Sequence, residues 1–301
     1  MSYQVEIFGL QFTINPVAFT LPIGKNGWDV YWYGIIIALG FLLAVVYALI
    51  YNEKRFGINT DKMLDVVLVT VPVAILCARA YYVIFDGVKL GGIKDFFGFG
   101  DSSGFAGIAI YGGVIGAFLC GALMCYIRKV NILDMFDLAS VGFIIGQGVG
   151  RWGNFINQEA YGTFTGSDWW GMQSSRTIME MGEGLVHPCF LYESVWCIIG
   201  FFVLNAVAKK RRFKGLVFLS YIVWYSFARF FIEMLRTDSL MIGKIRVSCL
   251  VSALIFIGAA IILVVLFNKN KQQVNEGEYE TVFAANTDEA EEPKEEIAED
   301  E

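Results

Sequence analysis

The chain has 301 residues, and its composition is 56% hydrophobic, 16% aromatic and only 17% charged. Soluble domains contain about 45–50% apolar and about 25% charged residues, so this composition excludes an ordinary soluble domain. The formal net charge is −6, but residues 276–301 alone contain twelve Asp or Glu residues and one Lys. The rest of the chain is therefore basic, and the acidic block is too polar to bury a core.

Long apolar runs set the expected fold class. A membrane-spanning helix needs about 20 mostly apolar residues, and seven runs in the chain qualify. The sequence thus predicts an all-α polytopic membrane protein, with a membrane domain over residues 1–268 and an acidic, disordered tail over residues 269–301. No basic region precedes the first run, so we expect no cleaved signal peptide. In chain order the runs are Val30–Tyr51, Met63–Phe85, Ile108–Ile127, Leu133–Val149, Pro188–Ala208, Leu216–Met234 and Val247–Phe267.

Lys and Arg in the connections indicate the orientation, because cytoplasmic loops are enriched in these residues. Twelve basic residues follow the first, third, fifth and seventh runs, whereas the opposite connections carry eight. This bias predicts an external N-terminus and a cytoplasmic C-terminus. It also leaves residues 152–186 as an extracytoplasmic loop or small head, whose Trp152, Trp169 and Trp170 suit the membrane interface.

Charged residues also occur within the runs, where a charge costs several kcal/mol and normally faces a partner or a watery cavity. One interpretation is structural, with Arg–Glu pairs locking helices together. The number of such residues favours the other, a polar cavity within the membrane. They are Arg79, Arg151, Glu193, Arg229 and Glu233.

The sixth run shows how such a cavity is built. Tyr225, Arg229 and Glu233 follow one another at intervals of four, and Arg236 comes three residues later. On a helix this spacing places the side chains in one stripe. Arginine offers a planar fork of donors that stays charged, so the stripe is suited to phosphate.

The end of the fourth run is rich in glycine and then in amide and charged groups. Four glycines fall within residues 146–153, and each weakens a helix by about 1 kcal/mol relative to Ala. They permit either close helix packing or close approach of the backbone to a ligand, and the spacing does not separate the two. Arg151, Asn154, Asn157 and Glu159 follow where the run is expected to leave the membrane.

Histidine and cysteine point to no metal or covalent chemistry. The only histidine, His187, precedes Pro188 at the expected start of the fifth run, where a structural donor is a commoner role than a catalyst. The six cysteines show no C-x-x-C spacing, which favours small buried hydrophobes over disulfides or metal ligands. We therefore expect no metal and no cofactor, and no nucleophile motif or phosphate loop is present.

The stretch at residues 150–162 carries a specific resemblance. It reads G-R-W-G-N-F-I-N-Q-E-A-Y-G and closely resembles the signature of the prolipoprotein diacylglyceryl transferases. Further segments match that family in the same order, so that the resemblance covers about residues 28–267. These segments are W-Y-G from Trp32, A-R-A-Y-Y-V-I-F from Ala78, H-P-C-F-L-Y-E from His187 and R-F-F-I-E-M-L-R-T-D from Arg229.

The resemblance implies an enzyme of the bacterial cytoplasmic (inner) membrane. It would transfer the diacylglyceryl group of phosphatidylglycerol to the lipobox cysteine of prolipoproteins, forming a thioether and releasing glycerol phosphate. Its partners would be phosphatidylglycerol, prolipoprotein signal peptides and membrane lipids, and we expect no nucleic acid. Two alternatives from other classes are a lipid or anionic-solute transporter and another phospholipid headgroup enzyme. The absence of a visible inverted repeat argues against the transporter.

The resemblance also implies roles for individual residues of this chain. The resemblance implies that Arg151 and Arg229 hold the phosphate, that Glu233 and Glu159 hold the guanidiniums, and that Asn154 and Tyr33 orient the headgroup. Tyr225 and Tyr111 fall on catalytic positions with an open role. Expected secondary site residues are Arg79, Asn157, Gly162, His187, Glu193 and Arg236.

Tyr111 is a departure from the family pattern. Many members have a histidine before the paired glycines of the third span, whereas this chain reads A-I-Y-G-G. A histidine base at that position is therefore excluded. Because a tyrosine normally titrates near 10, Tyr111 suits a hydrogen-bond donor better than a base.

Overall fold

The structure is a computed structural model that describes residues 2–22, 27–85, 96, 109–237, 241–242 and 245–275. Most of the predicted acidic tail therefore lies outside the described residues. The chain divides into two compact units, Met1–Tyr51 with Phe136–Glu301, and Asn52–Met135.

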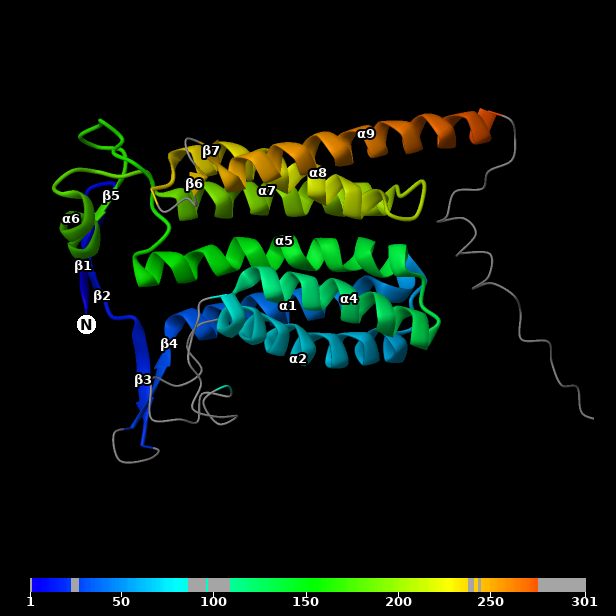
Figure 1. Cartoon of the computed structure of the whole chain (residues 1–301), viewed down its shortest axis with the longest axis horizontal. Helices are drawn as coiled ribbons and strands as arrows, with labels where there is room; N and C mark the ends of the chain where they lie inside the picture. The colour runs from blue at the N-terminus through cyan, green and yellow to red at the C-terminus, as the bar shows by residue number, and fades with distance from the viewer. Residues whose placement is uncertain are drawn as a thin grey trace, which may run out of the picture. The chain divides into compact units, whose positions relative to one another are not determined.

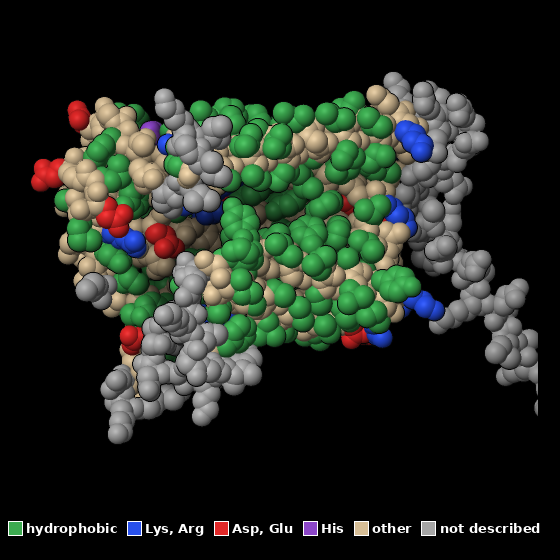
Figure 2. All heavy atoms as spheres, viewed as in Figure 1, with side chains coloured by type: hydrophobic (Ala, Val, Ile, Leu, Met, Phe, Trp, Pro, Cys, Tyr) green, Lys and Arg blue, Asp and Glu red, His purple; other side chains and the backbone are tan. Residues whose placement is uncertain are grey.

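The described helices include seven that are long and apolar enough to cross a membrane, which confirms the seven predicted spans (Figure 1). Hydrophobic side chains cover the visible sides of the helices, whereas charged side chains gather near their ends (Figure 2). The spans are α1 (Trp32–Phe56), α2 (Thr60–Phe85), α4 (Ile110–Arg128), α5 (Ile132–Asn157), α7 (Cys189–Lys209), α8 (Leu216–Leu235) and α9 (Val247–Asn275).

Helix α5 differs from its predicted span in length. The apolar run was expected to end at Val149, but the helix continues to Asn157, about two turns further. Arg151, Asn154 and Asn157 therefore project from a regular helix and not from the loop after it. The regular backbone fixes their spacing.

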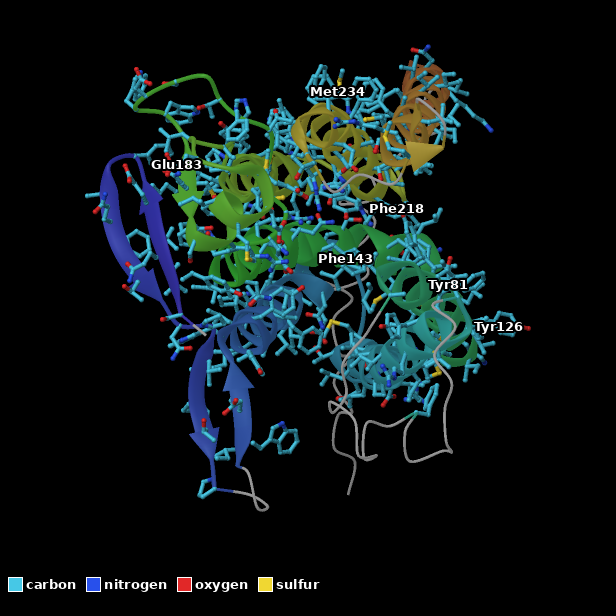
Figure 3. All side chains as sticks on the ribbon, turned by 60° about the vertical axis from the view of Figure 1, so that its left-hand side comes forward. Tyr81, Tyr126, Phe143, Glu183, Phe218 and Met234 are labelled. Carbon is cyan, nitrogen blue, oxygen red and sulfur yellow. The ribbon has the colours of Figure 1, made fainter. Side chains whose placement is uncertain are left out.

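In the unit Asn52–Met135, α2 and α4 pack closely because of two glycines. A Cβ on Gly112 would lie 2.5 Å from the carbonyl oxygen of Cys77, and one on Gly116 would lie 2.6 Å from the Cys77 Cβ. Arg128 pairs with Asp65 between the two helices, on an exposed surface. Tyr126 projects outward from α4 (Figure 3).

Glycines also bring the helices of the larger unit together. On α1 and α5, a Cβ at Gly40 would lie 3.3 Å from the backbone of Gly146. Between α5 and α7, a Cβ at Gly148 would lie 3.1 Å from the Cys197 Cβ. These contacts support the packing role of the glycine-rich run.

A pair of tryptophans joins α7 to α8. The rings of Trp196 and Trp224 stack with centroids 4.5 Å apart, and each indole N–H donates to the other residue's carbonyl, at 3.0 and 3.2 Å. Buried indoles need such partners, so the pair fixes the register of the two helices. This register decides which side chains of α7 face those of α8.

At the other end of these helices, Asp137 of α5 anchors the loop between α7 and α8. Its buried carboxylate accepts hydrogen bonds from the Arg211 guanidinium at 3.0 Å and from the backbone N–H groups of Gly215 and Phe218 at 2.8 Å. Gly215 has φ +89°, a conformation that favours glycine. A buried carboxylate needs this degree of pairing.

Besides the expected helices, the connections contain short β-strands. An antiparallel sheet has the order β2-β1-β5, from Leu10–Ile14, Tyr3–Ile7 and Met172–Ser174, with Val5 opposite Ser174. A separate hairpin pairs β3 (Val17–Leu21) with β4 (Trp28–Tyr31), and β6 (Met241–Ile242) pairs with β7 (Ile245–Arg246). The sequence analysis did not predict these strands.

We call residues 2–14 and 158–188 the cap. It contains the β2-β1-β5 sheet and the short helix α6 (Ser175–Met181), whose N-terminus is closed by a capping box of Ser174 and Thr177. A hydrophobic cluster joins the cap to the C-terminal end of α5 and the start of α7. The buried members of the cluster are Val5, Ile14, Phe155, Tyr161, Met172, Val186 and Phe190.

Candidate active site

Three helices of the larger unit bring charged side chains together around Glu193. One carboxylate oxygen of Glu193, on α7, lies 2.7 Å from Nη2 of Arg151 on α5. Its other oxygen lies 3.5 Å from Nη1 of Arg229 on α8. Nη2 of Arg229 lies 2.5 Å from Glu233, one turn further along α8. We call Arg151, Glu193, Arg229 and Glu233 the Arg–Glu cluster.

The acidic and basic side chains of this cluster differ in solvent exposure. The side chains of Glu193 and Glu233 are each 3% exposed, whereas those of Arg151 and Arg229 are 19% and 21% exposed. The carboxylates are therefore covered and the guanidiniums are accessible. Any group that reaches the cluster therefore meets more of the arginine side chains than of the glutamates.

Both arginines also have N–H groups that are not engaged in the contacts described above. A guanidinium has five N–H groups. Within the described residues, Arg151 donates to Asn154, Glu193 and Tyr225, and Arg229 pairs only with Glu193 and Glu233. Each arginine is thus held in place by a carboxylate and still has N–H groups without a described partner. Such groups can donate hydrogen bonds to a phosphate.

Tyr225 joins the cluster from one turn before Arg229. Its hydroxyl donates to Glu193 at 2.7 Å and accepts from Nη2 of Arg151 at 3.4 Å. The predicted stripe of Tyr225, Arg229 and Glu233 does face one side, toward α7. The Tyr225 hydroxyl thus contacts both the acid and one arginine of the cluster, and its expected role in the reaction stays a prediction.

On α5 a chain of hydrogen bonds runs from Arg151 toward the cap. Nη1 of Arg151 donates to Asn154 at 3.2 Å, and the Asn154 amide donates to Glu159 at 2.9 Å. The Asn157 amide reaches the same oxygen of Glu159 at 3.5 Å. Glu159 was expected to contact a guanidinium directly. In the structure it is linked to Arg151 through the Asn154 side chain, and the acid that pairs with Arg151 is Glu193.

Two glycines of the 150–162 stretch allow close contacts beside this chain. A Cβ on Gly153 would lie 2.6 Å from the ring of Tyr33, which therefore packs closely against α5. A Cβ on Gly162 would lie 2.7 Å from the His187 Cβ and 3.1 Å from the Leu235 carbonyl oxygen. Gly162 also forms a β-bridge with Arg236, just after α8. Gly162 thus joins the cap to the end of α8, whereas Gly153 brings α5 close to Tyr33 of α1.

His187 belongs to a different network. Its Nδ1 lies 3.1 Å from the Tyr192 hydroxyl, which accepts from the Trp170 indole at 2.8 Å. Partial burial lowers the pKa of His187, which favours its neutral form. The residue ties the cap to Tyr192 of α7, in line with the structural role expected for it.

Arg79 and Tyr111 lie in the other unit. Nε of Arg79 donates to the Phe96 carbonyl oxygen at 3.0 Å, and the buried guanidinium lies 5.7 Å from the Tyr82 ring centroid. Tyr111 is exposed at the start of α4, with its ring 6.5 Å from that of Tyr81. Their expected roles in the reaction stay predictions.

The sequence analysis missed Arg246, which donates to the Glu233 carbonyl oxygen where α8 ends. No motif marked this residue. Glu193 was expected to be only a secondary site residue, although it is the only acidic residue within α7. Within the described residues, no three His, Cys, Asp or Glu side chains are placed to hold a metal ion.

Comparisons with known proteins relate the chain to one family. The family model for the prolipoprotein diacylglyceryl transferases matches residues 16–265. A phosphatidylglycerol–prolipoprotein diacylglyceryl transferase of Clostridioides difficile is 41% identical over 267 residues, covering 87% of this chain and 100% of its own. One of Pediococcus pentosaceus is 44% identical over 260 residues, covering 83% and 90%. One of Bacillus velezensis is 38% identical over 264 residues, covering 83% and 92%.

Proposed function

The chain belongs to the prolipoprotein diacylglyceryl transferase family, and we propose that its Arg–Glu cluster holds the phosphate of phosphatidylglycerol during the transfer. The protein is a multi-pass membrane transferase of lipoprotein maturation, which moves the diacylglyceryl group of phosphatidylglycerol to a prolipoprotein. The observation that carries the phosphate assignment is the pair of partly exposed arginines that are ion-paired with two covered glutamates.

The acceptor in this proposal is the lipobox cysteine. Its thiolate attacks the glyceryl carbon that bears the phosphate, and a carbon–sulfur bond forms as the carbon–oxygen bond breaks. The electron pair stays on the phosphate oxygen, so glycerol phosphate leaves with one more negative charge than the diester carried. The thiolate's charge accounts for that increase.

The site must therefore stabilise negative charge that collects on the leaving phosphate. Arg151 and Arg229 donate to it with N–H groups not used on the glutamates. Glu193 holds both guanidiniums toward the same point, so little reorganisation is needed as the charge develops. Loss of one such preorganised donor typically costs about 3–4 kcal/mol of transition-state stabilisation.

The positive field of the arginines also favours the nucleophile. A free thiol has a pKa of about 8.5, and the thiolate is the reactive form. A guanidinium near the cysteine stabilises the thiolate without accepting its proton, which passes to solvent or to the released monoester. No covalent enzyme intermediate is required.

We also propose the orientation in the membrane. The basic residues near the C-terminal ends of α1, α4, α7 and α9 and in the loops after them favour a cytoplasmic location for those ends, in a bacterial cytoplasmic membrane. The cap and the Arg–Glu cluster would then lie on the outer side, where the prolipoprotein cysteine arrives. An extracytoplasmic cap of this kind matches a translocated substrate.

Purified full-length protein in lipid nanodiscs tests the proposal. With phosphatidylglycerol and a lipobox peptide, the peptide should gain a diacylglyceryl mass while an equal amount of glycerol phosphate appears. Arg229→Lys should retain the charge but lose most of the turnover, because Lys lacks the planar fork. Arg212→Lys, on the exposed loop between α7 and α8, is the matched control and should turn over normally. Lipid movement between leaflets without peptide modification would instead indicate a transporter.

A further inference from the structure

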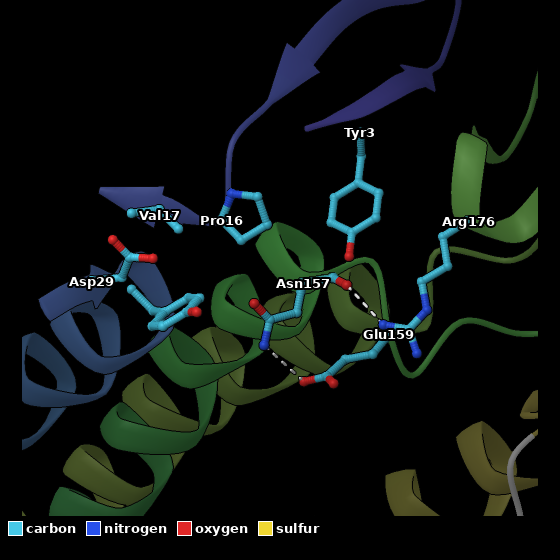
Figure 4. A pocket seen from close by; sticks show the side chains of 8 residues that line it. Tyr3, Pro16, Val17, Asp29, Asn157, Glu159 and Arg176 are labelled. Carbon is cyan, nitrogen blue, oxygen red and sulfur yellow. Dashed lines mark hydrogen bonds between the residues drawn. The ribbon is translucent and has the colours of Figure 1, made fainter. Parts of the chain in front are cut away.

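A polar pocket of about 380 Å³ lies where the N-terminal strands meet the C-terminal end of α5 (Figure 4). The phosphate proposal does not use it. Its lining comes from four parts of the larger unit: β1, the β3–β4 hairpin, the end of α5 with the following turn, and α6. The residues are Tyr3, Pro16, Val17, Asp29, Tyr31, Asn157, Glu159 and Arg176.

Several of these groups keep unused hydrogen-bonding capacity. Glu159 accepts from Asn154 and Asn157 through Oε1 alone, and Asp29 accepts from Thr20 through Oδ1 alone, within the described residues. The Tyr3 hydroxyl points toward Asn157 and Glu159 (Figure 4). Two carboxylate oxygens and the phenol groups of the lining are thus available to a ligand.

Arg176, the basic residue of the lining, already has partners. Arg176 pairs with Glu180 at 2.9 Å and donates from Nη1 to the Asn157 carbonyl oxygen at 3.2 Å, where α5 ends. A cation is favoured at a helix C-terminus, so this contact is structural. The pocket therefore offers acceptors and phenol hydroxyls, and it is poorly suited to a second anionic group.

The pocket is coupled to the Arg–Glu cluster. Glu159 lines the pocket and accepts from Asn154, whose own side chain accepts from Arg151. Arg151 and Asn157 are six positions apart, which corresponds to about 9 Å along the helix. That length suits a phosphate at one end and a three-carbon alcohol at the other.

We propose that this pocket binds the two hydroxyl groups of the glycerol headgroup of phosphatidylglycerol, with Asp29 and Tyr31 as specificity-determining residues. The inference rests on the proposed phosphate site at Arg151. With the phosphate on that arginine, the acyl chains point away from the cap and the headgroup glycerol points into the pocket. Each hydroxyl donates to a carboxylate oxygen, Glu159 Oε2 or Asp29 Oδ2, and the Tyr31 hydroxyl donates in return.

The test compares two lipids that differ only in the hydroxyls. Phosphatidylpropanol has the same three-carbon headgroup without either hydroxyl, and phosphatidylglycerol has both. The full-length enzyme should transfer from phosphatidylglycerol with a kcat/KM about tenfold or more higher, the scale of one or two hydrogen bonds. Asp29→Asn and Tyr31→Phe should each bring this ratio several-fold closer to one. Asp29→Asn keeps an acceptor for Thr20, so the hairpin stays intact.

Glu183→Gln is the matched control, since Glu183 is an exposed acidic residue of the cap outside the pocket (Figure 3). It should leave the ratio between the two lipids unchanged. Wild-type ratios in both Asp29→Asn and Tyr31→Phe would overturn the inference. A raised KM for the lipobox peptide with an unchanged lipid ratio would also overturn it, by assigning the pocket to the peptide. No transfer from either lipid by the parent enzyme would instead refute the proposed function.

Discussion

The carboxylate of Glu193 lies 2.7 Å from the guanidinium of Arg151, although the two residues come from different helices and from two separate motifs of the sequence. The same carboxylate also faces Arg229 on a third helix. A single buried acid thus sets the separation of two arginines. The geometry of the proposed phosphate site depends on this one residue.

The first prediction concerns Glu193→Gln. The amide still accepts from Tyr225, but it no longer neutralises two guanidiniums, so the arginines should move apart. We expect kcat/KM to fall by about 10–100-fold and the melting temperature to fall, because breaking a buried ion pair costs about 3–5 kcal/mol. Enzyme kinetics and thermal unfolding in detergent measure both effects.

Asp65→Asn is the control for this change, because it removes the acid of an exposed ion pair with Arg128. Surface pairs contribute about 0–1 kcal/mol, so its melting temperature should stay near that of the parent. If Glu193→Gln behaved like Asp65→Asn in both assays, the organising role of Glu193 would be wrong.

Two glycines of α5 make a matched pair for the second prediction. A Cβ on Gly153 would meet the Tyr33 ring at 2.6 Å, whereas a Cβ on Gly146 would meet nothing within 4 Å. Gly153→Ala should displace Tyr33 and lower transfer activity by tenfold or more. Gly146→Ala should leave activity unchanged and stabilise the helix by up to about 1 kcal/mol. Equal activities for the two variants would contradict the contact.

The third prediction is a pH dependence from His187. Burial lowers the pKa of His187, so the folded protein binds this proton less readily than the unfolded chain. The stabilising contribution is full above about pH 6.5, the unfolded value, and is lost as the pH falls below it through the lower pKa of the folded state. His187→Gln should therefore show a smaller drop in melting temperature between pH 8 and pH 5.5 than the parent does. An unchanged drop would assign the dependence to other groups.

Tyr111 supplies the fourth prediction. If it positions a substrate by donating a hydrogen bond, Tyr111→Phe should lose about 1–3 kcal/mol of transition-state stabilisation, or one to two factors of ten in rate. Activity should rise toward alkaline pH with the peptide thiol, without a step near 6.5 in the parent enzyme. A folded Tyr111→Phe variant with no activity would favour a base at this position.

Much of the architecture is readable from the sequence, because membrane spans leave long apolar runs such as Val247–Phe267. The pairing of Arg229 with Glu233 also follows from their spacing on one helix. The role of Glu193 was not accessible in this way, since its contacts with Arg151 and Arg229 depend on how α5, α7 and α8 pack.

The strands were missed for a similar reason. β1 and β5 are three to five residues long and lie far apart in the chain, so neither shows a periodic pattern that predicts the other. The extension of α5 past Val149 was hidden by its glycines, which are poor helix formers alone and are held here by neighbouring helices. Tertiary packing overrides the local preference at both places.

The most direct test of the central claim is a double-mutant cycle on Arg151 and Arg229. If both arginines hold one phosphate through Glu193, Arg151→Lys and Arg229→Lys should each lower kcat/KM by about 100-fold or more, and removing the second fork should matter little once the first is gone. The account therefore predicts that Arg151→Lys/Arg229→Lys is only slightly worse than the worse single variant. Losses that multiply in the double variant would show that the two arginines act independently, and would contradict a shared phosphate site.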